Sequence, residues 1–466
     1  VGEFPPGEHD HPDRLLIPAR LYGREGEIDA LLAAFERVVR GGPPRMVLVR
    51  GLPGIGKSSV VNELHRVLVP PRGLFASGKF DPLGRDVPYA TLARALRSLV
   101  RRLLAKPGAE LGRWRDRLRE ALEPNGAPVV ELVPELKLVV GEQPPVPEVP
   151  PTEAKARFQV ALRRLIGVFA RPEHPLALFL DDLQWLDAAT LDLLEDLLVR
   201  PDLRHLFLVG AYRDAEVDAA HPLARRLAAI RGAGAAVEEI ALGPLGHEDL
   251  ARLLADALRC EPRRAARLAR LVHGRTAGNP FFAGQLIREL AEEGSIAFDP
   301  GAARWVWELG PIRARGHKEN VVELMAGKLG RLPPAAREAL SDLACLGSSA
   351  PASTLAIVRE VPEEELHSIL WDALRLELVV RSEGSYRFVH DRVREAAYSL
   401  VPEEQRPAAH LRIGRLLDRG LRGDRREESV FEIAGQLDRG SALIASQDER
   451  DEVAELDLAA GRRARA

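Results

Sequence analysis

The chain has 466 residues, of which 46% are hydrophobic and 29% charged, and its formal net charge at pH 7 is −3. This length exceeds what one hydrophobic core holds, so we expect two to four globular domains. No apolar run approaches the length of a membrane span, no secretory leader opens the sequence, and no overall basic field favours nucleic acid. Cys260 and Cys345 lack zinc-site spacing and are predicted to be reduced thiols of a cytoplasmic protein.

Residues 1–20 are rich in proline, charge and histidine and are predicted to form a linker. His9 and His11 suggest a metal, but no second group of ligands follows them. The stretch LYGREGE (21–27) then leads into an amphipathic helix over 28–39, and its Arg24 is placed to reach back over a bound nucleotide. A start on Val1 and an end inside an Ala/Arg-rich helical pattern suggest a segment of a larger protein.

A phosphate-binding loop is predicted directly after the apolar run 46–49, which is typical of a buried parallel strand. GLPGIGKSS (51–59) fits G-x-x-x-x-G-K-[ST], and the helical pattern behind it completes the context that this motif requires. Its glycines let backbone N–H groups turn toward phosphate oxygens, and the helix directs its positive end at the same anion. We expect Lys57 at the β- and γ-phosphates and the Ser58 hydroxyl on Mg²⁺. The predicted nucleotide contacts are Gly51, Pro53, Gly54, Ile55, Gly56, Lys57, Ser58 and Ser59.

Acidic residues follow a buried strand that is predicted over 176–180. Ligands of open α/β sheets sit at the carboxyl edge, where Asp181 and Asp182 fall. Asp181 fits the role of a Mg²⁺ partner, usually through water, and Asp182 that of polarising the attacking water. A helix cap is the alternative interpretation of such acids. Between the loop and this strand the pattern predicts a strand over 73–80, helices over 91–104 and 111–122, a proline-rich connection over 144–151 and a helix over 153–170.

Arg213 follows the next predicted strand, 206–211, and could contact the γ-phosphate or pair with a local acid. Lys57, Asp182 and Arg213 are therefore the expected catalytic residues. A strand over 237–242 is predicted to close the sheet. Helices over 248–258, 262–272 and 280–293 come next, and Asn279-Pro280 fits a helix start, which is compatible with Pro280 also packing against a base.

The remaining pattern is mostly helical. A hairpin is predicted around Asp299-Pro300-Gly301, within 295–309. Helices over 320–329, 334–346, 352–359 and 362–375 precede two short strands, 376–381 and 386–389, which together outline a winged helix. His390-Asp391 begins the next helix, where Asp391 is expected to cap it. Residues 403–466 resemble the start of a helical repeat array.

With these stretches in hand, the chain resembles the STAND class of signal-transduction ATPases, in the subgroup with an origin-recognition-like AAA domain. It looks most like the central ATPase segment of large bacterial proteins that join a serine/threonine kinase to a sensor histidine kinase. The resemblance is carried by LYGREGE (21–27), GLPGIGKSS (51–59), GKFD (78–81), VPYA (87–90), PELKLVVGEQP (134–144), LFLDDLQWLD (178–187), LVGAYRDAEV (208–217), TAGNPFF (276–282) and FVHDRVREAAY (388–398).

That resemblance implies a role for four residues of this sequence. Arg24 would lie near the adenine, Pro280 would belong to the base-contacting motif, and Arg213 would be a first-sensor residue. His390 would recognise the bound diphosphate, although Val389 stands where the better-known Met-His-Asp pattern has methionine. Upstream kinase and downstream sensor domains are implied by family architecture.

The expected fold class is an α/β P-loop NTPase with a parallel sheet and helices on both faces, followed by a helical lid, a winged helix and the start of a helical repeat region. The expected domains are a linker (1–20), the NTPase domain (21–243), a lid with a hairpin (244–317), the winged helix (318–400) and a helical region (401–466).

The favoured function is a slowly hydrolysing ATP/ADP switch that is closed with ADP and open with ATP, with Mg²⁺ as its metal. Its partners would be other proteins or its own kinase and sensor domains, or further copies of the chain in a nucleotide-dependent oligomer, with no membrane. The alternative is a DNA-binding transcription regulator. A recognition helix needs cationic and base-reading side chains, whereas PEEELHSILWDALR (362–375) begins with acids that repel phosphates. A small-molecule kinase ranks last, because no acceptor pocket is evident.

Overall fold

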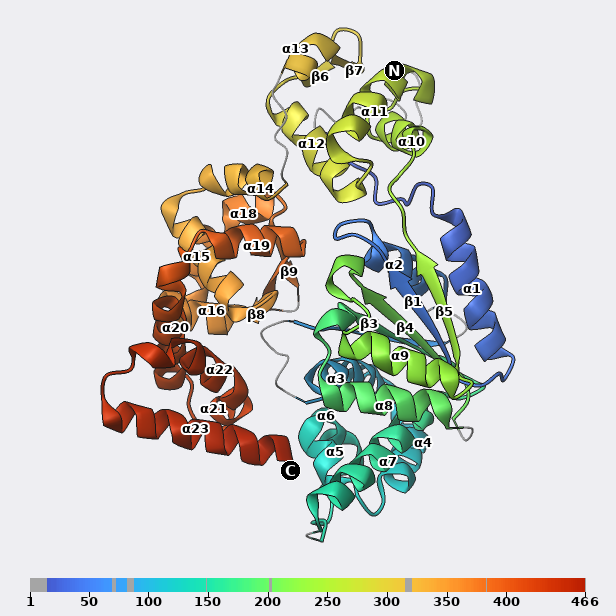
Figure 1. The fold of residues 1–466 in the computed structure, drawn as a ribbon, viewed down its shortest axis with the longest axis vertical. Helices are drawn as coiled ribbons and strands as arrows, with labels where there is room; N and C mark the ends of the chain where they lie inside the picture. The colour runs from blue at the N-terminus through green and yellow to red at the C-terminus, as the bar shows by residue number, and fades with distance from the viewer. Residues whose placement is uncertain are drawn as a thin grey trace.

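The computed structural model describes residues 15–465, apart from 69–72, 82–87, 148, 201–202, 315–320 and 383. The predicted linker histidines, His9 and His11, lie outside these residues. Figure 1 shows three bodies: the sheet with its flanking helices, a helical group beyond one end of the sheet, and the C-terminal region beside both. Within the described residues, we find no helix that is both long and apolar enough to span a bilayer.

A five-stranded parallel sheet in the order β2-β3-β4-β1-β5 forms the first body. The strands are β1 (Arg45–Arg50), β2 (Leu74–Lys79), β3 (Leu176–Asp181), β4 (Leu206–Tyr212) and β5 (Ala236–Ala241). All five strands agree with the predicted ones to within two residues at their ends. The expected P-loop α/β fold is therefore confirmed, with β5 at the sheet edge beside β1.

Both faces of this sheet are covered by helices, because successive side chains of a strand point to opposite faces. Met46 and Leu48 of β1 pack into one core cluster, and Val47 and Val49 pack into another. One face carries α1 (Glu25–Val39) and α2 (Lys57–Leu68). The other carries α3 (Ala90–Leu104), α4 (Gly108–Leu122), α5 (Ala127–Leu132), α6 (Glu135–Val140), α7 (Pro151–Phe169), α8 (Ala188–Val199) and α9 (Pro222–Gly232). The short helices α5 and α6 were not predicted.

The second body contains three helices, a hairpin and a final short helix around a core of its own. They are α10 (His247–Ala257), α11 (Pro262–Thr276), α12 (Pro280–Glu292), β6 (Ile296–Asp299), β7 (Arg304–Trp307) and α13 (Leu309–Ala314). The predicted hairpin is present, with Ile296 opposite Trp307 and Asp299 opposite Arg304. Tyr22 joins this core from the start of the chain.

The C-terminal region, residues 321–465, holds a three-stranded antiparallel sheet, β8-β10-β9, among helices. In chain order it contains α14 (Val321–Gly330), α15 (Pro334–Leu346), β8 (Ser349–Pro351), α16 (Ala352–Arg359), α17 (Glu363–Ile369), α18 (Trp371–Arg375), β9 (Val379–Ser382), β10 (Ser385–Phe388), α19 (Asp391–Ser399), α20 (Arg406–Gly420), α21 (Asp424–Glu428), α22 (Val430–Gly440) and α23 (Gln447–Arg465). One cluster of buried side chains runs through it from Met325 to Ala460.

One expectation for this region was wrong in detail, and one element was missed. The single helix predicted over 362–375 is divided into α17 and α18, because the backbone leaves helical geometry at Leu370 (φ −87°, ψ 0°). Strand β8 was not predicted, since Ser349–Pro351 is too short to show an alternating pattern. The acidic residues Glu363, Glu364 and Glu365 form the first turn of α17.

Candidate nucleotide site

The predicted phosphate loop joins β1 to α2 at the carboxyl edge of the sheet. Gly51, Gly54 and Gly56 have φ values of 151°, 79° and 100°, a region that side chains other than glycine rarely adopt. A Cβ at Gly56 would meet no atom within 4 Å, so the loop faces open space there. Ile55 is buried beneath the loop, and Ser59 is exposed on the first turn of α2.

Lys57 and Ser58 lie at the start of α2, and Ser58 contacts the end of β3. The Lys57 ammonium donates to the carbonyls of Gly51 (3.0 Å) and Leu52 (3.1 Å). Burial lowers the pKa of Lys57, while the carboxylates of Asp181 and Asp182 oppose that shift. The Ser58 hydroxyl donates to Asp181 Oδ2 at 2.7 Å, so the two predicted Mg²⁺ partners lie side by side.

Asp182 is buried at the same edge, with a left-handed backbone (φ 57°, ψ 49°). Such a conformation is uncommon outside glycine, although Asp tolerates it better than most residues, and it recurs at functional sites. Gln184 donates to Asp182 Oδ1 at 2.9 Å. Burial, followed by the charges of Asp181 and Asp391, raises the pKa of Asp182 to about 6, against the opposing effect of Lys79 and Arg213.

Arg213 lies just beyond β4, with its side chain only 4% exposed. Its Nε stands 3.5 Å from Asp182 Oδ1, and its Nη1 donates to Glu216 at 2.7 Å. Its guanidinium lies 4.6 Å from the ring centroid of Trp185. Of the two interpretations drawn from the sequence, the structure shows Arg213 as a partner for acids. The phosphate contact stays a prediction.

Asp391, the first residue of α19, enters this edge from the C-terminal region. Its carboxylate accepts from Lys79 Nζ at 2.7 Å and from Arg213 Nη2 at 2.8 Å. Lys79 Nζ also lies 3.1 Å from Asp182 Oδ2. We call Lys79, Asp182, Arg213 and Asp391 the edge cluster. Burial alone would raise the pKa of Asp391, but Lys79, which also hydrogen-bonds it, and Arg213 hold that pKa well below its usual range.

His390 lies beside the phosphate loop. Its ring stacks on Phe281 with centroids 3.9 Å apart, and its Nε2 is 3.4 Å from the position of a Cβ at Gly54. Burial lowers the pKa of His390 to about 4, so the ring is neutral at physiological pH. Its Nδ1 accepts from the N–H of Arg392 at 3.1 Å, which leaves the proton on Nε2. His390 is thus the cap of α19. The expectation that Asp391 would be this cap was wrong, because Asp391 turns to Lys79 and Arg213.

Three comparisons relate this chain to known proteins. Residues 20–209 match the family described as AAA ATPase domain. This part of the chain is an AAA ATPase domain. A curated protein of Dictyostelium discoideum, hybrid signal transduction histidine kinase G, is 25% identical over 577 aligned residues that cover 99% of this chain and 17% of that protein. The chain thus spans about one sixth of the length of this relative.

Two solved structures align with most of this chain. A STAND protein with a tetratricopeptide repeat sensor from Pyrococcus horikoshii aligns with a TM-score of 0.49 and 12% identity, covering 95% of this chain and 51% of that one. Orc1 of Aeropyrum pernix, solved in complex with DNA, aligns with a TM-score of 0.35 and 18% identity over 84% of this chain and 95% of its own.

Two further predicted contacts lie at the rim of the AAA domain. Arg24 is 5% exposed and donates to the carbonyls of Ile55 (3.3 Å) and Gly243 (2.5 Å), so it joins the phosphate loop to the connection toward α10. Pro280 begins α12, capped by Asn279, whose amide donates to the carbonyl of Pro53 at 2.9 Å.

Sequence reasoning did not select Lys79, Gln184 or Trp185 as site residues. Lys79 was quoted only within GKFD (78–81), although it ends a strand that lies beside β3 at the carboxyl edge. Because ligands of such sheets sit at this edge, the place of Lys79 at the end of a strand could have identified it as a site residue. Trp185 and Gln184 follow the two acids in a short 3-10 turn whose direction no periodic pattern reveals.

The residues present fit a nucleotide with Mg²⁺. The glycine loop leaves space at Gly56, and Lys57 supplies a cation beside it. Within the described residues no group of three or more His, Cys, Asp or Glu could hold a metal. Ser58 and Asp181 are the residues that would hold Mg²⁺, which commonly keeps several waters and takes few carboxylates besides phosphate oxygens.

Proposed function

We propose that this chain is an ATP-binding regulatory switch within a multidomain signalling protein, closed with ADP and open with ATP. One observation carries the proposal: Asp391 of the C-terminal region pairs with Lys79 and Arg213 of the AAA domain, next to Asp182. The C-terminal region thereby engages two cations beside the phosphate loop.

Charge explains how nucleotide would control this contact. A terminal γ-phosphate and the Asp391 carboxylate are both anions that suit Arg213, and they compete for it. ADP lacks the γ-phosphate and leaves Arg213 and Lys79 to Asp391. ATP would therefore favour release of α19 from the edge cluster, since a ligand shifts an equilibrium only through its differential interaction with the two states.

Different residues at this edge would bind the phosphates, hold the metal and activate the water. Lys57 would bind the β- and γ-phosphates, and Ser58 with Asp181 would hold Mg²⁺, which supplies charge neutralisation on the phosphates when bound. Asp182 would orient and polarise the attacking water. In the closed arrangement its carboxylate lies against Lys79 and Arg213, which hinders that role. We expect slow hydrolysis, because Arg213 would have to turn from Asp182 and Asp391 to the γ-phosphate before Asp182 is free to polarise water.

The signalling context rests on the Dictyostelium relative, named a hybrid signal transduction histidine kinase. We infer that the output passes to kinase or sensor domains of the same protein, or to other proteins, and that the open form can assemble with further copies. The residues 318–400 would act as a winged helix that packs on protein. A DNA-binding role is disfavoured by the three glutamates in the first turn of α17.

The experiment compares wild type with Asp391→Asn, which keeps the shape and removes the charge. Removing one partner of a fully buried ion pair costs about 3–5 kcal/mol, and the partial exposure of Lys79 reduces this to about 1–3 kcal/mol. We expect a labelled ADP to dissociate roughly ten- to a hundredfold faster and the protein to become larger in solution.

Glu363→Gln is the matched control, because Glu363 is also the first residue of a helix in the C-terminal region but lies in the exposed turn of α17. It should leave both readouts unchanged. Equal ADP dissociation in wild type and Asp391→Asn would contradict the switch, as would a defined DNA footprint that persists at raised salt.

A further inference from the structure

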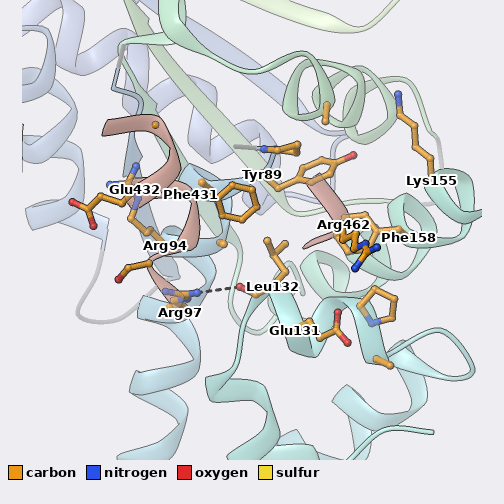
Figure 2. Close-up of a pocket in the computed structure, with 18 of the residues that line it drawn as sticks. Tyr89, Arg94, Arg97, Glu131, Leu132, Lys155, Phe158, Phe431, Glu432 and Arg462 are labelled. Atoms are coloured by element: carbon orange, nitrogen blue, oxygen red, sulfur yellow. Dashed lines mark hydrogen bonds between the residues drawn. The ribbon is translucent and has the colours of Figure 1, made fainter. Parts of the chain in front are cut away.

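A cavity of about 1430 Å³ lies between the AAA domain and the C-terminal region, away from the phosphate loop. Residues of α3, α5 and α7 line one side, and residues of the 346–351 segment, α22 and α23 line the other. Figure 2 shows Phe431 and Glu432 beside Arg94, Arg97 and Leu132. The cavity exceeds the usual 300–1,000 Å³ of small-molecule sites, so a ligand would fit together with water.

The lining is cationic in a chain whose net charge is −3. Its basic members outnumber its acidic ones two to one: Arg94, Arg97, Lys155, Arg157, Arg439 and Arg462 against Asp81, Glu131 and Glu432. Two of these cations have carboxylate partners close by, Lys155 with Asp192 at 2.7 Å and Arg157 with Glu153 at 2.6 Å. Such a surplus raises the local concentration of anions.

Arg94 and Arg97 differ from these two, because their hydrogen bonds go to uncharged acceptors. Arg94 donates to the Lys79 carbonyl and to the Thr91 hydroxyl, each at 3.2 Å. Arg97 donates to the Leu132 carbonyl at 3.3 Å, and its Nε forms a long ion pair with Glu135 at 3.6 Å, which leaves its other nitrogens for a further acceptor. The two guanidinium groups therefore retain capacity for an anion, which Arg binds in a fork geometry.

Apolar rings also line the cavity. Tyr89 and Phe158 lie with ring centroids 5.1 Å apart on the AAA side, and Phe431 approaches from α22. We propose that this cavity is a second binding site, for a small organic anion that joins an aromatic or similar apolar ring to a phosphate, sulfonate or carboxylate group. The ring would pack on these side chains, and the acid group would bind Arg94 and Arg97.

The site adjoins the contacts that join the two regions. Arg94 bonds the backbone of Lys79, the residue that reaches both Asp182 and Asp391. Asp81, also in the lining, accepts from the N–H of Ser348 across the interface at 2.8 Å. A ligand that contacts both walls favours the arrangement in which the walls face each other. The regulatory effect of the ligand rests on the proposed switch, whereas the binding of the ligand does not.

The test titrates the whole chain, saturated with ADP, with anilinonaphthalene sulfonate, a fluorescent aromatic sulfonate. We expect one saturable site. Arg94→Gln on the AAA side should weaken binding about tenfold or more through loss of a charge-assisted bond. Gly435→Leu should weaken it similarly from the opposite wall. A Cβ at Gly435 has only Arg439 Nη1, at 3.6 Å, within 4 Å, so a leucine there fills the cavity and suits helix α22.

Two variants serve as matched controls. Gly274→Leu replaces an exposed glycine of α11 with open space around it, and Arg66→Gln removes an exposed arginine of α2. Both should bind the probe as wild type does. Circular dichroism checks that each variant folds. If Arg94→Gln does not fold, Gly435→Leu still tests the cavity. Absence of a saturable site, or unchanged affinity in either cavity variant, overturns the proposal.

Discussion

The phosphate loop and the edge cluster lie at the same edge of the sheet but are built in opposite ways. The loop takes its glycines, Lys57 and Ser58 from eight consecutive residues. The edge cluster takes Lys79, Asp182, Arg213 and Asp391 from four separate segments, one of them outside the AAA domain. The loop is therefore complete within the AAA domain, whereas the cluster exists only while the C-terminal region rests on it. We therefore propose that the loop binds nucleotide and that the cluster regulates the chain.

If the loop is the binding device, Lys57→Ala should have the largest effect on nucleotide. The variant loses a cation that would make charge-assisted bonds to two phosphates, each worth about 1.5–3 kcal/mol. We expect ADP and ATP affinity to fall by about a hundred- to ten-thousandfold, measured by calorimetry, with the fold intact. Lys137→Ala, which removes an exposed ion pair with Glu142, is the control. Wild-type affinity in Lys57→Ala would refute the assignment of the loop.

Asp182→Asn and Asp181→Asn separate chemistry from metal binding at the sheet edge. Asp182→Asn should keep Mg·ATP and lose hydrolysis by about a hundredfold or more, because it removes the group that polarises water. Asp181→Asn should mainly weaken the metal-dependent part of binding, since Ser58 and Asp181 lie together. Single-turnover hydrolysis and Mg²⁺ titrations measure the two effects. Identical losses of binding in both variants would show that the roles are not divided.

The pH dependence of hydrolysis tests the role of Asp182 in the edge cluster. Burial and neighbouring carboxylates raise the pKa of Asp182 to about 6, and the ionised carboxylate is the active form. Activity should therefore be full above that pKa and fall about tenfold per pH unit below it. Burial and Asp181, the first two causes of this shift, remain when α19 moves. An acid limb of the rate profile centred near the ordinary Asp pKa, about 4, would therefore contradict the environment of Asp182 described above.

His390 links the loop and the edge cluster, and its removal should have the smallest effect of the four. Its neutral ring carries a proton on Nε2 that faces the loop near Gly54. His390→Ala should release ADP about tenfold faster with ATP affinity nearly unchanged, because the contact would exist only in the closed state. His367→Ala, whose ring contacts Tyr386 within the C-terminal region, is the control. If His390→Ala released ADP at the wild-type rate, His390 would act only as the cap of α19.

Sequence alone predicted the sheet, the phosphate loop and the two acids, because each depends on contiguous residues with a recognisable period or spacing. It assigned Asp391 to a helix cap, since an acid at a helix start is satisfied locally in most settings. In the structure the adjacent His390 makes that bond, and the packing of α19 brings Asp391 to Lys79. Tertiary packing decides whether His390 or Asp391 turns toward the other domain. The local sequence of residues 386–398 does not show which one does.

The division of helix 362–375 has a similar cause. Its residues fit one helical pattern, but Leu366 and Leu370 are both fully buried in the C-terminal core, and the backbone turns at Leu370. Packing of this kind overrides helix propensity, which is a weak preference.

The central claim is that ADP holds the C-terminal region on the edge cluster through Asp391 and that ATP releases it. The most direct measurement is the distance between spin labels on Arg66→Cys of α2 and Arg387→Cys of β10, both exposed positions, with Cys260 and Cys345 replaced. We predict one short distance with ADP, a longer population with a non-hydrolysable ATP analogue, and that longer population already with ADP in Asp391→Asn. The same distance distribution in all three samples would contradict the account.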